Sequence, residues 1–140
     1  MAIRVLLVDD EPMFLEALTA LLEHDDRIAV VGAADSGARA LALADEHRPD
    51  VALVDLAMPD LDGFELTRKL RACECAPRVL AVSGLSHRHD VDRALEAGAS
   101  AFLLKGGLYD EVAEAIVSAS AESGPAPAEP GSEEPGEALA

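Results

Sequence analysis

The chain has 140 residues, enough for one domain; half of them are apolar, but only 3% of the chain is aromatic and it has no Trp, so its core must be aliphatic. Its formal net charge is −16, from 27 acidic and 11 basic residues. Nucleic-acid affinity comes largely from Lys and Arg that neutralise phosphates, so we do not expect this acidic chain to bind nucleic acid unaided. No apolar run approaches the roughly 20 residues of a membrane span, and the start lacks signal-peptide features, which predicts a cytoplasmic protein without membrane contact.

Five runs rich in Val, Ile and Leu predict strands at residues 3–8, 28–34, 51–54, 79–82 and 101–104. Between them, and after the last, apolar residues recur at helical spacing, for example at Phe14 and Leu18 and at Val112 and Ile116. Continuous apolar strands that alternate with amphipathic helices are typical of a parallel sheet covered on both faces. The predicted fold class is α/β: a doubly wound, five-stranded parallel sheet with strand order 2-1-3-4-5.

Pro, Gly and capping residues mark where these elements begin and end. Pro12 suits the first turn of a helix, and Asp62 followed by Glu65 predicts a capping box. Gly32 and Gly98 are expected at the ends of elements. From Gly124 the sequence is rich in Pro, Gly and Glu, so we predict a domain at residues 1–121 and a disordered tail or linker at 122–140.

Acidic residues follow two strands that this order makes neighbours. Asp9, Asp10 and Glu11 come directly after the first strand, and Asp55 ends the third. Ligands of doubly wound sheets bind at this edge, where the winding reverses. Clustered carboxylates repel one another unless a cation lies among them, and Mg²⁺ prefers such oxygen ligands. The alternative is that the first three acids only favour the start of a helix.

Ser83 and Lys105 end the fourth and fifth strands at the same edge. A hydroxyl and an ammonium beside a metal ion can bind the oxygens of a phosphoryl group, and Asp is a known nucleophile toward phosphorus. The alternative for Lys105 is a surface lysine that closes a strand.

Four motifs together resemble the response-regulator receiver family of bacterial two-component systems. They are Val-Asp-Asp-Glu-Pro at 8–12, Leu-Val-Asp-Leu-Ala-Met-Pro-Asp-Leu-Asp-Gly at 53–63, Val-Ser-Gly at 82–84 and Ala-Phe-Leu-Leu-Lys at 101–105. The resemblance covers about residues 3–121 and implies a flavodoxin-like fold. It also implies that the domain is not an enzyme but a phosphoacceptor, which assists its own Mg²⁺-dependent phosphorylation and dephosphorylation.

The resemblance also implies a role for each matching residue. Asp55 would accept the phosphoryl group from a histidine kinase or phosphotransfer protein, and Ser83 and Lys105 would bind its oxygens. Mg²⁺ would be held by Asp9, Asp10, Asp55 and the backbone carbonyl of Ala57. Phe102 occupies the position of the switch aromatic, whose rotamer is expected to follow Ser83. Without the resemblance, Phe102 would be interpreted simply as an aromatic residue of the core.

Gly106 and Gly107 follow Lys105, where many family members have Pro. Receivers joined to helix-turn-helix domains often lack that Pro, so the chain resembles that subfamily more closely. The chain is therefore expected to be a stand-alone receiver or the regulatory domain of a transcription regulator. The resemblance implies signalling through the fourth helix, fifth strand and fifth helix, and homodimerisation on phosphorylation is possible. The side chains of Ala57 and Leu85 cannot activate water, which predicts slow dephosphorylation.

Three rival functions remain to be weighed. A dehalogenase-type phosphatase needs a second Asp where this chain has Ala57, and no phosphate-binding Gly-rich loop supports a nucleotide enzyme. The serious alternative is a receiver-like binding module that is not regulated by phosphate.

Cys73 and Cys75 are interpreted as reduced thiols near a helix end, and His87 and His89 as solvated residues at a helix start.

Overall fold

The computed structural model describes residues 2–58, 61–84 and 88–121, without the side chains of Leu61, Arg88, His89 and Leu108. Five parallel strands form one sheet in the order β2-β1-β3-β6-β7. Their bounds are β1 Ile3–Val8, β2 Ile28–Ala34, β3 Val51–Asp55, β6 Arg78–Ser83 and β7 Ala99–Leu104. Counted along the chain, these five strands have the predicted order 2-1-3-4-5, so the predicted fold class is confirmed.

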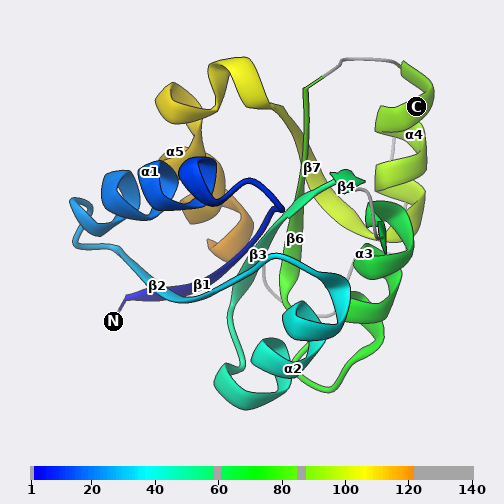
Figure 1. Cartoon of the computed structure of the whole chain (residues 1–140), viewed down its shortest axis with the longest axis horizontal. Helices are drawn as coiled ribbons and strands as arrows, with labels where there is room; N and C mark the ends of the chain where they lie inside the picture. Colours follow the sequence, from blue (N-terminus) through cyan, green and yellow to red (C-terminus); the bar gives the residue numbers. More distant parts are fainter. Residues whose placement is uncertain (1, 59–60, 85–87, 122–140) are drawn as a thin grey trace.

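Helices cover both faces of the sheet (Figure 1). Helices α1 (Pro12–Glu23) and α5 (Leu108–Ala121) lie on one side, and α2 (Gly37–His47), α3 (Gly63–Ala72) and α4 (Arg88–Ala97) lie on the other. Each face has its own apolar core, because successive strand residues point to opposite sides. In β1, Val5 and Leu7 pack toward the first pair of helices, whereas Leu6 and Val8 pack toward the other three.

The helix signals in the sequence were largely correct. Pro12 opens α1, and Asp62 caps α3, although its side chain accepts the N–H of Phe64 rather than that of Glu65. Gly98 follows α4 with φ of +113°, a conformation that glycine adopts without strain. The expectation for Gly32 was wrong: it lies inside β2 and pairs with Leu6, directly after the point where the register between the two strands shifts.

Smaller elements also shape the edge of the sheet where the strands end. The short strands β4 (Ala57–Met58) and β5 (Leu61–Asp62) pair antiparallel between β3 and α3, and a 3-10 turn, η1 (Lys105–Gly107), joins β7 to α5. The sequence analysis did not predict them. Among the helices that the structure describes, none has the length and apolarity that a membrane crossing requires. The predicted tail at 122–140 and the residues Leu85 and His87 lie outside the described part of the chain.

Candidate functional site

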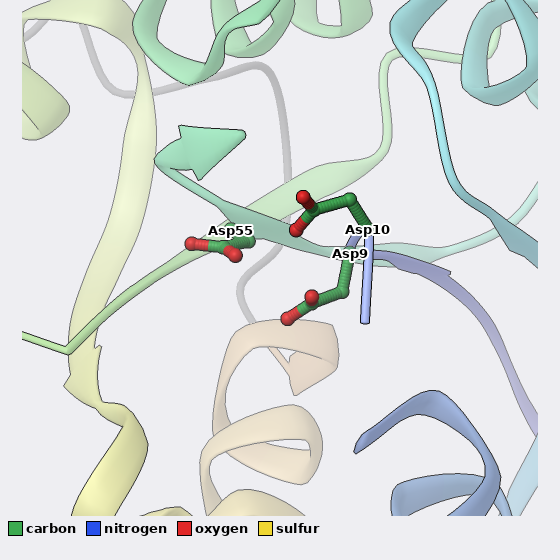
Figure 2. A group of neighbouring side chains, drawn as sticks. All are labelled: Asp9, Asp10 and Asp55. Atoms are coloured by element: carbon green, nitrogen blue, oxygen red, sulfur yellow. The ribbon is translucent and has the colours of Figure 1, made fainter. Parts of the chain in front are cut away.

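Three aspartates meet where β1 and β3 end. One carboxylate oxygen from each of Asp9, Asp10 and Asp55 lies within 4.8 Å of the others. Figure 2 shows the carboxylates of Asp9 and Asp10 leaving the end of β1 on opposite sides, with Asp55 at the end of the neighbouring β3. The predicted meeting of these residues is therefore confirmed, and it follows from the direct pairing of β1 with β3.

Two of these carboxylates are almost withdrawn from solvent. Asp9 is 2% exposed and Asp55 is 4% exposed. In each, Oδ1 accepts a backbone N–H two residues further on: that of Glu11 at 2.9 Å for Asp9, and that of Ala57 at 3.0 Å for Asp55. Each local turn fixes one oxygen of its carboxylate and leaves the second, Oδ2, for other partners.

Lys105 supplies the positive charge of the cluster. Its Nζ lies 2.9 Å from Asp9 Oδ2 and 3.3 Å from Asp55 Oδ2, and it also donates a hydrogen bond to Glu11 Oε1. The contact with Asp9 is an ion pair without hydrogen-bond geometry, so Asp9 Oδ2 is a buried oxygen with no hydrogen-bond donor. Such an orphaned oxygen is chemically suited to a cation.

The buried charges change the acidity of the cluster. Burial raises the pKa of Asp9, and the negative charge of Asp55 adds to this effect, which outweighs the opposing contacts with Lys105 and the Glu11 N–H. For Lys105, burial lowers the pKa, but the hydrogen bond to Glu11, the close contact with Asp9 and the negative charges of Asp55 and Asp9 outweigh burial, so the pKa is raised. Lys105 therefore remains charged at neutral pH. Its contacts with two buried aspartates argue against the alternative of a surface lysine that only closes a strand.

The other predicted residues lie at or beside the same edge. Ser83 is buried at the end of β6, one residue beyond Val82, which pairs with Asp55 across the sheet. Phe102 is partly buried in β7 and packs against the core under α2, α3 and α4, as expected of a core aromatic. Ala57 uses its N–H to hold Asp55, and its side chain is exposed.

The sequence analysis missed two contacts of Lys105. Glu11 was noted only as one of three acids after the first strand, but its carboxylate pairs with Lys105, 94 residues away. Phe14 was assigned to the helix core, yet its ring centroid lies 4.5 Å from Lys105 Nζ, a distance typical of a cation–π contact. Local spacing carries no signal for either contact.

Known proteins share both this sequence and this fold. The family model for the response regulator receiver domain matches residues 5–117. A probable transcriptional regulatory protein NarL from Mycobacterium tuberculosis is 40% identical over 115 residues, which cover 82% of this chain and 53% of that protein. The transcriptional regulatory protein LiaR from Bacillus subtilis is 39% identical over 118 residues, which cover 84% of this chain and 56% of that protein.

The solved structures agree. The signal receiver domain of the putative response regulator NarL from Mycobacterium tuberculosis has a TM-score of 0.81 and 38% identity, over 87% of this chain and 98% of that domain. The chain spans about half the length of these two curated relatives. A family model that matches most of the chain, and a similar receiver structure over nearly its full length, lead to one conclusion. The chain belongs to the response regulator receiver family of two-component signal transduction.

Proposed function

We propose that the chain is a phosphorylation switch in which Asp55 accepts a phosphoryl group from a histidine kinase or a phosphotransfer protein. The observation that carries this proposal is the environment of Asp55. Its carboxylate is buried beside two further aspartates and within 3.3 Å of the ammonium of Lys105. A nucleophilic carboxylate next to compensating charge is the arrangement that phosphoryl transfer requires.

Mg²⁺ is the metal that fits this donor set. The oxygens of Asp9, Asp10 and Asp55 are hard ligands, and the orphaned Oδ2 of Asp9 offers a buried coordination position. We assign the remaining protein ligand to the backbone carbonyl of Ala57. When bound, Mg²⁺ would neutralise the charge that develops on the transferred phosphoryl oxygens.

The chain's own residues would perform the rest of the transfer. The Ala57 N–H holds Asp55 Oδ1, which leaves Oδ2 directed at Lys105. Oδ2 would attack phosphorus, so that the new O–P bond forms while the bond from phosphorus to the donor nitrogen breaks. Lys105 and the hydroxyl of Ser83 would then bind phosphoryl oxygens, and Phe102 would follow the displacement of Ser83. In this proposal the chain is a phosphoacceptor rather than an enzyme.

A receiver-like module that is not phosphorylated is the second candidate. It predicts that a residue of the phosphorylation machinery is missing or misplaced. Here Asp9, Asp10, Asp55 and Lys105 share one cluster, which favours the switch. The phosphatase alternative fails at Ala57, because a methyl group cannot act as an acid or a base.

A small phosphodonor such as phosphoramidate, supplied with Mg²⁺, tests the proposal directly. The wild-type protein should gain the mass of one phosphoryl group, and Asp55→Asn should gain none. Asp26→Asn, which changes an exposed aspartate next to the α1–β2 turn, is the matched control and should behave like wild type. Equal labelling of the wild type and Asp55→Asn would refute the assignment of Asp55.

We further assign the receiver domain to residues 1–121 and propose that residues 122–140 are a disordered linker or tail. The chain would act alone or as the regulatory domain of a transcription regulator. Its partners would contact the face formed by α4, β7 and α5, and phosphorylation would allow homodimers to form. The exposed side chains of Leu95, Leu104 and Tyr109 on these elements support an interaction surface there.

A further inference from the structure

Two thiols lie side by side at the edge of the sheet opposite the aspartate cluster. Cys73 caps the C-terminus of α3, Cys75 lies in the loop that enters β6, and both are half-buried. Their Sγ atoms are 3.3 Å apart, within hydrogen-bonding distance. We propose that Cys73 and Cys75 are a reversible redox site that forms an intramolecular disulfide with a low-molecular-weight disulfide as oxidant.

The surrounding contacts hold the two sulfurs in place before any reaction. Cys73 Sγ donates to the carbonyl of Leu70 at 3.0 Å, and Cys75 Sγ lies 3.6 Å from the carbonyl of Ala44 in α2. The loop beyond them is anchored by Arg71, whose Nη1 donates to the carbonyls of Ala76 and Pro77 at 2.7 and 3.0 Å. Bonding therefore requires the sulfurs to close from 3.3 Å to about 2.05 Å, without bringing distant segments together.

The environment gives the two thiols different roles. Burial, together with the hydrogen bond to Cys73, raises the pKa of Cys75 to about 11. Cys75 therefore keeps its proton at neutral pH and is a poor nucleophile. Cys73 is accordingly the attacking thiol and Cys75 the resolving thiol.

The chemistry balances in two exchange steps. The Cys73 thiolate attacks one sulfur of the oxidant, which forms a mixed disulfide and releases the first thiol. Cys75 then loses its proton and attacks the Cys73 sulfur, which forms the internal disulfide and releases the second thiol. The cysteine pair loses two electrons and two protons, and the oxidant gains them.

The disulfide would be easily reversed and would loosen local contacts. It closes a ring with a single intervening residue, Glu74, and small strained disulfides are the labile, regulatory kind. Both sulfurs would also lose their S–H donors to the carbonyls of Leu70 and Ala44. Oxidation would therefore weaken the junction between α2 and the C-terminal end of α3.

Glutathione disulfide is the probe for the test, with the full chain in native buffer. The intact mass of the wild type should fall by two hydrogen atoms, and neither cysteine should then react with an alkylating agent. Dithiothreitol should restore the original mass and the two reactive thiols. Cys75→Ser should accumulate a mixed glutathione disulfide at Cys73, whereas Cys73→Ser should react much more slowly. The double Cys73→Ser/Cys75→Ser variant should show no change.

The same reaction in urea separates a preorganised pair from two ordinary cysteines. The internal disulfide should form faster in the native protein than in the unfolded chain, because folding holds the sulfurs together. The proposal is overturned if native wild type accumulates two mixed disulfides or linked dimers, or if unfolding speeds ring closure. None of these readouts depends on phosphorylation of Asp55.

Discussion

Gly63 packs closely against the backbone of residues 55 and 56, next to the proposed phosphoacceptor, and an added methyl group there should be strongly disruptive. It is buried at the first position of α3. A Cβ atom at this residue would lie 2.5 Å from the Cα of Leu56 and 2.9 Å from the carbonyl oxygen of Asp55. Both neighbours are backbone atoms, so no side-chain rotation can relieve the overlap.

The size of the effect follows from these distances. Overpacking usually costs about 1–3 kcal/mol, and rigid backbone neighbours place Gly63→Ala near the upper end of that range. The gain in helix propensity from Gly to Ala is at most about 1 kcal/mol in a helix interior and smaller at a first position. We expect a net loss of about 2–3 kcal/mol, which lowers the melting temperature of a domain of this size by roughly 10 °C.

Thermal unfolding of Gly63→Ala beside Gly84→Ala is the measurement. Gly84 is exposed and has no atom within 4 Å of the position of an added Cβ, so its substitution should leave the melting temperature nearly unchanged. Displacement of residues 55 and 56 should also slow phosphorylation of Gly63→Ala. A melting temperature for Gly63→Ala within about 2 °C of wild type would refute the packing argument, since that shift corresponds to roughly 0.5 kcal/mol.

Further predictions concern the charged cluster and its neighbours. Lys105→Ala leaves the buried carboxylates of Asp9 and Asp55 without a compensating charge. In metal-free buffer we therefore expect the free energy of unfolding to fall by about 2 kcal/mol, less than the usual cost of breaking a fully buried ion pair. An unchanged melting temperature would contradict this expectation. Millimolar Mg²⁺ should raise the melting temperature of wild type and narrow the deficit of Lys105→Ala; equal melting curves with and without Mg²⁺ would count against the metal site. Because the folded-state pKa of Asp9 is raised above its unfolded value, its charged form destabilises the fold above the unfolded pKa. Asp9→Asn should therefore melt higher than wild type at pH 7 without metal, and this gain should vanish as the pH falls below about 4. Finally, Ala57→Asn should speed loss of the phosphoryl group in Mg²⁺ buffer, because an amide can orient the attacking water; decay no faster than wild type would contradict the predicted effect of Ala57 on dephosphorylation.

The sequence alone determined the strands and the edge at which the acidic residues lie. Runs such as residues 51–54 are apolar without interruption because a central parallel strand is buried on both faces, and β3 is buried at every position. Polar residues at the end of such runs must lie at the carboxyl edge of the sheet. This rule correctly predicted the positions of Asp9, Asp55 and Ser83. These signals are local, so a single sequence is enough to read them.

Tertiary structure alone decided which groups meet and which elements deviate from the pattern. The partners of Lys105 come from residues 50 and 94 positions away, and only the pairing of the strands brings them together. The register shift next to Gly32 arises from the pairing of β1 with β2, which neither strand specifies by itself. The 3.3 Å approach of Cys73 and Cys75 likewise depends on how the end of α3 turns into β6 against α2. The physical reason is common to all three: these contacts are set by backbone placement across elements, whereas residue spacing along the chain reports only which face of its own element a side chain occupies.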